Sequence, residues 1–221
     1  LPTGVAARPT WVVPIGDLPG FFRTTADDFP RRSGYLTVDP VAVEGMRATL
    51  GARAAGRPIV GIAWRGGSAY THAVHRTIPL GQWLPILRHD ALFVSLAYHE
   101  ATPEITAVAA EGITIVDLPD VTAADDYQRT CELVAALDLV ITVPTSVVHA
   151  AGGVGTPCWV VMDQRAAWRE CSCDSSIPWY PLTHRRFIRP KTARVWTDTM
   201  GDVATALQTW RTSHSASPSK Y

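Results

Sequence analysis

The chain has 221 residues, enough for one domain of ordinary size plus an appendage, and 47% of them are hydrophobic. Its 20 basic residues balance 20 acidic ones, which excludes the strongly basic composition of a nucleic-acid-binding domain. The apolar runs are of strand length, too short to span a membrane, and no signal-peptide pattern opens the chain, so we expect a cytoplasmic protein.

Residues 1–57 are rich in Pro, Gly and Arg and differ in pattern from the rest of the chain. They carry one predicted helix, 41–53, which the cap residue Asp39 and the first-turn proline Pro40 introduce. The segment is too irregular for a domain and predicts an interdomain linker. The first residue, Leu1, is not Met, and we expect the chain to come from the middle of a longer protein.

From residue 58 onward, predicted strands and helices alternate. The strands are 58–64, 91–97, 113–118, 138–143, 157–162 and 185–190, and the helices are 80–88, 103–110, 124–137, 147–151 and 198–211. The strands are continuous apolar runs, which is typical of a parallel sheet covered by helices on both faces. We therefore predict an α/β domain over residues 58–212, followed by a flexible tail, 213–221.

Ligands of such sheets bind beyond the carboxyl ends of the strands, so the loops there are the candidate sites. The loop after the first strand carries Arg65, Gly66, Gly67, His72, His75 and Arg76. Its glycines let the backbone approach an anion, and arginines offer forked donors to a phosphate. The same loop is equally compatible with a solvated surface segment.

The stretch PTSVVH, residues 144–149, begins a short helix at the end of the fourth strand. Thr145 and Ser146 are cap-type residues, and the free N–H groups of the first turn make a seat for an anion. His149 lies on the same helical face and could contact a phosphate or a ribose hydroxyl. The competing interpretation is a histidine packed under the next loop.

Other candidates have simpler explanations. Asp125, Asp126 and Tyr127 begin the 124–137 helix, where acidic residues suit the helix dipole. The loop 163–183 holds Trp168, Arg169, Trp179 and Tyr180, which either cap the sheet or shape a sugar or base pocket. Cys171 and Cys173 have poor zinc spacing, so we expect neither a metal nor a cofactor.

No motif of a self-contained catalyst is visible: the chain has no nucleophile elbow, no HExxH and no convincing pair of carboxylates. The residues alone therefore predict a protein that binds a phosphorylated ligand.

The ordered series VGIAWRGG, HRTIPL, FVSLAYHE, LVAALDLVITVPTSVVHAAGGVGTPCWVV, WRE, IPWYP and RRFIRP resembles the carboxyl-terminal half of bacterial glycosyltransferases that often follow tetratricopeptide repeats. These are relatives of the lipopolysaccharide heptosyltransferases (family 9) and, more distantly, of O-GlcNAc transferase (family 41). The resemblance runs from about residue 11 to residue 210. It implies one Rossmann-like half of a GT-B fold, which holds the donor of an inverting glycosyltransferase, a nucleotide-diphosphate sugar.

The resemblance also implies the partners and the division of labour. Residues 1–57 would include the remnant of an amino-terminal domain, and the acceptor or tetratricopeptide region of the same protein would be the partner. The catalytic base would lie in that domain, so we expect the 221-residue chain alone to be a poor or inactive transferase. No metal is implied, because arginines and a helix N-terminus can carry the leaving-group charge.

The residues matched to the donor site share a place at strand ends or helix starts. Arg76 matches a basic residue at the donor diphosphate; Arg65, Gly66 and Gly67 match the loop that the family writes as W-x-G-N/G; Thr145, Ser146 and Val147 match the phosphate-binding helix start; His149 matches a histidine near the ribose and phosphates; Ser95 to Tyr98 match a segment lining the nucleotide pocket; and Asp126 matches a position near the ribose or base.

The chain departs from the family pattern at three places: Pro144 stands where many relatives have Asp, and Ala97 and His99 replace Gln and Gly. These departures put the donor specificity in doubt and leave the donor base, the sugar and the acceptor open. A non-catalytic nucleotide-sugar-binding module is the main alternative, which the loss of an acid at Pro144 would suit. A GT-B-fold sugar epimerase is a weaker one.

Overall fold

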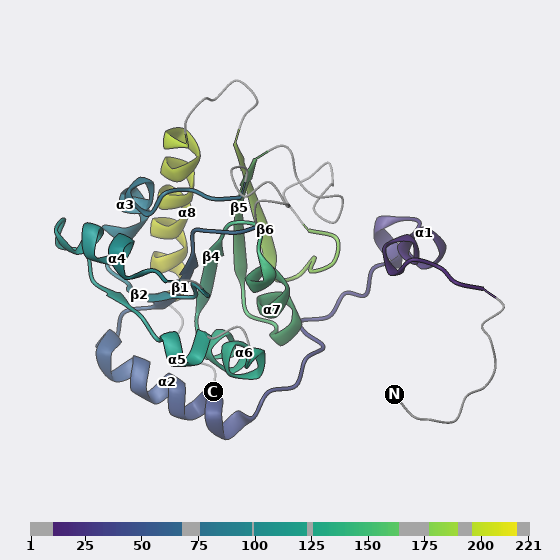
Figure 1. Cartoon of the computed structure of the whole chain (residues 1–221), viewed down its shortest axis with the longest axis horizontal. Coiled ribbons are helices and arrows are strands. Elements are labelled where there is room, and N and C mark those ends of the chain that lie inside the picture. The colour runs from purple at the N-terminus through teal and green to yellow at the C-terminus, as the bar shows by residue number, and fades with distance from the viewer. Residues whose placement is uncertain are drawn as a thin grey trace. The chain divides into compact units, whose positions relative to one another are not determined.

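The computed structural model describes residues 11–67, 76–98, 100–122, 126–163, 177–189 and 196–215. Its centre is a six-stranded sheet in the order β3-β2-β1-β4-β5-β6, with every neighbouring pair parallel (Figure 1). The strands are β1 (Ile59–Ala63), β2 (Leu92–Ser95), β3 (Ile115–Val116), β4 (Leu139–Thr142), β5 (Cys158–Asp163) and β6 (His184–Arg189). The predicted α/β, Rossmann-like class is confirmed.

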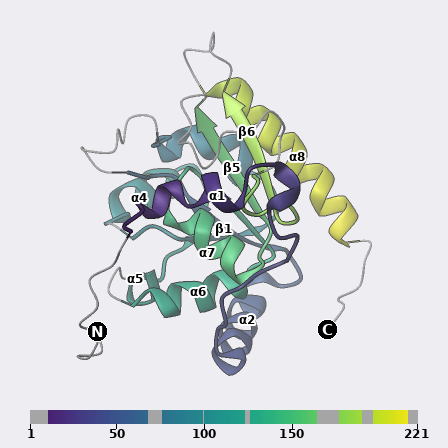
Figure 2. The same cartoon turned by 90° about the vertical axis from the view of Figure 1, so that its right-hand side faces the viewer.

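Helices cover both faces of the sheet (Figure 1). One face carries α3 (Leu84–Leu87), α4 (Thr102–Ala109) and α8 (Thr197–Ser215), together with the 3-10 turn η5 (Leu80–Trp83). The other face carries α2 (Pro40–Ala54), α5 (Pro119–Thr122), α6 (Tyr127–Ala135) and α7 (Ser146–Val154). Helix α8 contacts α3 and β6, and it lies beside β6 in Figure 2.

The two-sided cover explains why the strands read as unbroken apolar runs. Successive side chains of a strand point to opposite faces, and here both faces are buried. In β1, Val60 and Ile62 join the core under α8, whereas Ile59 and Ala63 join the core under α2, α6 and α7. A polar residue at any of these positions would face a helix rather than water.

The predicted helix 80–88 is two elements, because Pro85 stands in the first turn of α3 and restarts the helix after η5. The predicted helix 124–137 is shorter, Tyr127–Ala135, and the turn α5 before it was not predicted. Helix α8 extends to Ser215, past the predicted end at Arg211, and residues 216–221 of the predicted tail lie outside the described residues.

The predicted helix 41–53 is confirmed as α2, and the side chain of Asp39 accepts a hydrogen bond from the N–H of Val41, as expected of a cap. Its Leu50 and Ala54 are buried in the core that α6 and α7 share. Although we predicted this segment as part of a linker, α2 is packed on the sheet domain.

A carboxylate joins α2 to the sheet. Arg47 of α2 donates a hydrogen bond to the carbonyl of Ala136 (2.8 Å) and forms an ion pair with Asp138. The second carboxylate oxygen of Asp138 accepts a bond from the N–H of Ile59, at 2.7 Å. Asp138 therefore satisfies the first N–H of β1 and holds α2 at the same time.

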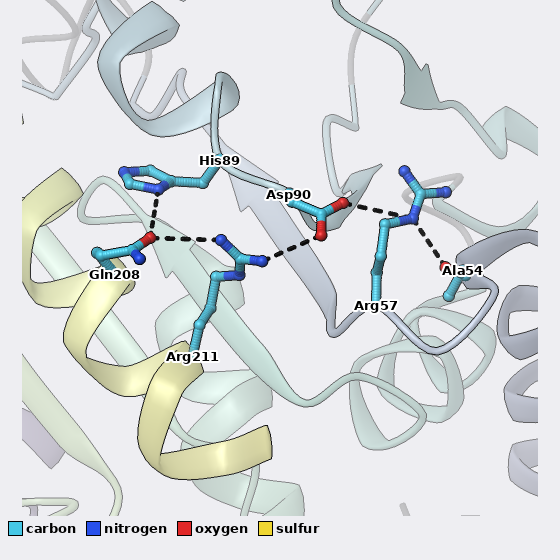
Figure 3. Close-up of polar contacts among 6 residues, drawn as sticks. All are labelled: Ala54, Arg57, His89, Asp90, Gln208 and Arg211. Atoms are coloured by element: carbon cyan, nitrogen blue, oxygen red, sulfur yellow. Dashed lines mark hydrogen bonds and ion pairs between the residues drawn. The ribbon is translucent and has the colours of Figure 1, made fainter. Parts of the chain in front are cut away.

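A second polar network lies at the amino-terminal edge of the sheet (Figure 3). Asp90 forms ion pairs with Arg211 of α8 (3.2 Å) and with Arg57, which leads into β1 (3.9 Å). Gln208 accepts hydrogen bonds from Arg211 and from Nδ1 of His89 (3.4 and 3.2 Å). These contacts fix the end of α8 and lie at the edge opposite the predicted ligand site.

The chain divides after Arg31 into two compact units. The described part of the first unit holds the short turns η1 (Ile15–Asp17), α1 (Pro19–Phe22) and η2 (Ala26–Asp28). Within the described residues, no helix is both long and apolar enough to cross a membrane.

Candidate functional site

The strand order places a topological switch point between β1 and β4. From β1 the chain winds through β2 to β3 at one edge, and from β4 it winds through β5 to β6 at the other. Open parallel sheets bind ligands outside the carboxyl ends of the two strands at such a point. Ala63 and Thr142 are paired at these ends, so the segments 64–67 and 143–146 leave the sheet side by side.

Gly66 is where two predicted segments meet, the loop after the first strand and the stretch 144–149. A Cβ atom there would lie 2.7 Å from the carbonyl oxygen of Pro144, 3.2 Å from that of Arg76 and 3.4 Å from the Cβ of Thr145. Only glycine allows these backbones to approach so closely. The structure therefore brings together Gly66, Arg76 and Thr145, which we predicted as donor contacts, and it shows that Pro144 contributes its carbonyl to this packing.

The two predicted arginines differ in their partners. Arg65 Nε lies 3.0 Å from a carboxylate oxygen of Glu104 in α4, so its charge is already balanced. Arg76 is half-buried, and its side chain forms no hydrogen bond or ion pair with any residue that the structure describes. Of the two guanidinium groups, Arg76 is the one available to an anion.

Helix α7 begins at this switch point with donors that its cap residue does not satisfy. Thr145 is the N-cap, but its side chain makes no capping hydrogen bond. Its Oγ1 is buried and has no partner among the described residues. Val147 is buried and offers only its backbone N–H, whereas Ser146 is exposed. Unsatisfied N–H groups and the helix dipole together favour an anion here.

Two tyrosines stand next to this helix start. Tyr98 follows β2 and is 45% exposed, and Tyr127 begins α6 and is 37% exposed. Burial raises the pKa of Tyr127, a hydrogen bond with the Ser146 side chain opposes that rise, and Tyr98 is near enough to add to it. We predicted Tyr98 for the nucleotide pocket but read Tyr127 only as part of a first turn. Asp126, the exposed N-cap of α6, makes no capping bond.

Ser95 does not reach a surface. It is fully buried in β2, and its Oγ accepts a hydrogen bond from the N–H of Ala97 at 3.3 Å. This bond stabilises the turn just before Tyr98, so Ser95 has a structural role in the predicted pocket segment.

His149 is half-buried, and its Nδ1 lies 3.0 Å from the hydroxyl of Tyr180. Tyr180 is buried on α7: a Cβ at Gly152 would lie 2.2 Å from its ring. The loop aromatics that we expected either to cap the sheet or to shape a pocket thus include one that packs on the helix. His149 is therefore anchored by a packing partner, as the competing interpretation expected, and it lies in the first half of the helix that begins at the switch point. Its predicted contact with a ligand stays a prediction.

His184, in β6, also packs against Tyr180, with 4.6 Å between the ring centroids and an angle of 34° between the rings. Its Nε2 donates to the carbonyl of Val148 (2.8 Å), and its Nδ1 accepts from the hydroxyl of Thr183 (2.9 Å). Burial lowers the pKa of His184 to about 4, so the ring is neutral at pH 7. No motif in the sequence pointed to this residue, which lies in a strand.

Several sequence candidates lie outside the described residues: His72, His75, Asp125, Trp168, Arg169, Cys171 and Cys173, and with them the departure at His99. Among the described residues, no group of three or more His, Cys, Asp or Glu is arranged to hold a metal ion. Cys131 and Cys158 are buried free thiols.

A groove of about 820 Å³ lies elsewhere, between β6 and α8, where Trp159, Phe187 and Trp210 form its apolar wall. It is open and shallow and sits beyond β5 from the switch point. We assign the candidate site to the switch point, because the available arginine, the close glycine contact and the uncapped helix meet there.

Comparison with known proteins fits this fold. No family profile matches the chain. The chain is 33% identical over 196 residues to protein FlbA of Caulobacter vibrioides, across 88% of this chain and 32% of that protein. It therefore spans about a third of the length of this relative.

Two solved structures share the fold at low sequence identity. ADP-heptose lps heptosyltransferase II of E. coli matches 87% of this chain and 58% of its own, with a TM-score of 0.55 and 16% identity. The glycosyl transferase family 9 structure from Veillonella parvula DSM 2008 matches 82% and 55%, with a TM-score of 0.57 and 10% identity. The predicted likeness in fold to family 9 is confirmed. The predicted association with tetratricopeptide repeats and the likeness to family 41 stay predictions.

Proposed function

We propose that the chain is the donor-binding half of an inverting glycosyltransferase, which transfers a sugar from a nucleotide-diphosphate sugar. The convergence of Gly66, Arg76 and the start of α7 at the switch point carries this proposal. A diphosphate needs a cation and several N–H donors at one place, and this place supplies both. The likeness in fold to glycosyltransferase structures supports the choice of ligand.

In this proposal, Arg76 and the first turn of α7 hold the diphosphate, and Thr145 and Ser146 add hydroxyl groups. His149 contacts the ribose or the phosphates, and the loop at Arg65 borders the site. The charge that develops on the leaving group would be stabilised by these groups, so the proposal requires no metal or cofactor.

The nucleoside end would lie toward Tyr98 and Tyr127, with Asp126 close to the ribose or base. Aromatic rings beside an exposed carboxylate suit a base and a ribose hydroxyl. The acceptor, the catalytic base and the tetratricopeptide partner are assigned to other parts of a longer, cytoplasmic bacterial protein. We accordingly expect the 221-residue chain to bind nucleotide without sustained transfer, and efficient transfer by this chain alone would contradict the assignment.

Calorimetric titration with UDP, GDP and ADP tests the proposal and identifies the base. Arg76→Ala should weaken binding of the preferred nucleotide roughly tenfold to a hundredfold, because a hydrogen-bonded charge contributes about 1.5–3 kcal/mol. Arg88→Ala is the matched control: it removes the same charge from an exposed side chain whose nearest partner, Glu111, lies 3.7 Å away. Unchanged affinity in folded Arg76→Ala would refute the phosphate assignment.

A second candidate is a nucleotide-sugar-binding module without catalysis. The observation in its favour is Pro144, which presents a carbonyl to Gly66 and leaves no carboxylate at that position. Both candidates predict nucleotide binding by this chain. They differ in the full-length protein, where only a transferase would consume the donor sugar in the presence of acceptor.

A further inference from the structure

A chain of polar contacts connects His149 to a distant part of the sequence. Nδ1 of His149 lies 3.0 Å from the Tyr180 hydroxyl, and that hydroxyl lies 3.3 Å from the hydroxyl of Tyr35. The rings of Tyr35 and Tyr180 are nearly parallel, with 6.5 Å between their centroids. The two hydroxyl groups thus connect Tyr35 to the imidazole of His149.

Tyr35 belongs to a segment, residues 32–38, that we call the strap. The strap is bound to α7, the helix that carries His149: the N–H groups of Tyr35 and Leu36 donate to the carbonyl of Gly153, at 2.7 and 2.8 Å. A Cβ at Gly34 would lie 2.8 Å from the same carbonyl oxygen. Close backbone packing therefore sets the position of Tyr35 relative to His149.

Tyr180 is held from two sides. Its ring lies so close to Gly152 that a Cβ there would be 2.2 Å away, and the His184 ring, tilted by 34°, packs against it at 4.6 Å between centroids. His184 is itself hydrogen-bonded to the carbonyl of Val148, the residue before His149. This packing positions the Tyr180 hydroxyl relative to α7, at 3.0 Å from Nδ1 of His149.

The chemistry of these groups indicates which of them donates and which accepts in each hydrogen bond. A phenol is a better donor than acceptor toward a neutral imidazole nitrogen, and on this ground we assign the donor role toward Nδ1 to Tyr180 and the donor role toward Tyr180 to Tyr35. A neutral His149 then carries its proton on Nε2. That nitrogen is a hydrogen-bond donor, which suits the oxygen atoms of a phosphate or a ribose.

We propose that Tyr180, supported by Tyr35 of the strap, is a positioning residue that holds His149 in the rotamer and the Nε2–H tautomer needed to contact the donor. The inference rests on the proposed function for its last step only. The Tyr35 side chain supports a role beyond packing, because Tyr35 is 52% exposed and yet directs its hydroxyl to Tyr180.

The tautomer can be measured without any ligand. Long-range proton–nitrogen correlation spectra of the 221-residue chain, with His149→Gln to assign the signals, should show His149 as Nε2–H at pH 7.5. Tyr180→Phe keeps the ring and removes the hydroxyl, and it should move both nitrogen shifts toward a mixture of tautomers. Tyr35→Phe should cause a smaller change in the same direction. An Nδ1–H tautomer in the unsubstituted chain, or unchanged shifts in Tyr180→Phe, would overturn the proposal.

Nucleotide affinity tests the last step. With the nucleotide that binds best among UDP, GDP and ADP, Tyr180→Phe should raise Kd about tenfold and Tyr35→Phe less. In the His149→Gln background, Tyr180→Phe should have no further effect. A further loss in that background, or no loss in the single variant, would overturn the positioning role. Failure of the unsubstituted chain to bind any of the three would instead overturn the proposed function, while the nitrogen shifts still decide the tautomer.

Discussion

Gly152, in the middle of α7, offers the sharpest test of the packing described above. A Cβ atom at this position would lie 2.2 Å from Cδ1, 2.4 Å from Cε1 and 2.5 Å from Cγ of Tyr180. The movement of the ring is restricted, because His184 packs against it and is hydrogen-bonded to the backbone of α7. Gly152→Ala therefore forces α7 and Tyr180 apart.

The magnitude follows from three contributions. Overpacking of a tight contact costs about 1–3 kcal/mol. Displacing Tyr180 also loses its hydrogen bond to His149, which contributes about 1 kcal/mol. The better helix propensity of alanine returns up to about 1 kcal/mol. The free energy of unfolding of Gly152→Ala should fall by about 2 kcal/mol.

Urea denaturation followed by tryptophan fluorescence measures this loss. Gly45→Ala is the matched control, because Gly45 is also inside a helix and a Cβ there meets nothing within 4 Å. The control should be stabilised by about 0.5–1 kcal/mol. If the two variants are equally stable, the contact between Gly152 and Tyr180 does not constrain α7, and the reasoning about Tyr180 is wrong.

Three further outcomes are expected. Gly66→Ala should weaken nucleotide binding at least tenfold in a chain that still folds, because its Cβ must push back the carbonyl of Pro144; calorimetry on the folded variant checks this. Asp138→Ala should lower the free energy of unfolding by about 2–3 kcal/mol, because it leaves the N–H of Ile59 and a guanidinium without their partner; urea denaturation measures it. His184 has a folded pKa of about 4, below its ordinary 6.5, so the unfolded chain binds its proton first as the pH falls. The stability that the neutral ring contributes, about 3 kcal/mol, is complete above pH 6.5 and is lost as the pH falls toward 4. The free energy of unfolding, measured by denaturation at pH 7 and at pH 5, should therefore drop less for His184→Gln than for the unsubstituted chain.

The sheet could be predicted because strands that are buried on both faces appear in the sequence as continuous apolar runs. Runs such as 58–64 and 138–143 contain no interior charge, since either face of β1 and β4 meets a helix. The position of the candidate site followed from the same rule, because carboxyl ends of parallel strands share one edge. The side-by-side arrangement of the segments after β1 and β4 depends on the strand order, which no local pattern reveals.

The partners of the predicted residues could not be read from the sequence. Arg65 and Arg76 look alike in their loop, yet only the fold places Glu104 against the first of them. Tyr127 stands behind two acidic residues that suit a helix start, so its contact with Ser146 is visible only once α6 and α7 are neighbours. Contacts between segments far apart in the chain produce no periodic pattern in the sequence from which they could be predicted.

The three glycines after His149 are an example of such contacts between segments far apart in the sequence. Gly152, Gly153 and Gly155 each lie against a neighbour within the chain: the Tyr180 ring, the Leu36 side chain of the strap, and the carbonyl of Ser33, where α7 ends in a left-handed residue (φ 90°). Helix α7 thus begins at the switch point and ends under the strap. The strap thus contacts the carboxyl end of α7 through backbone hydrogen bonds to Gly153, and it reaches His149 through the hydroxyl groups of Tyr35 and Tyr180.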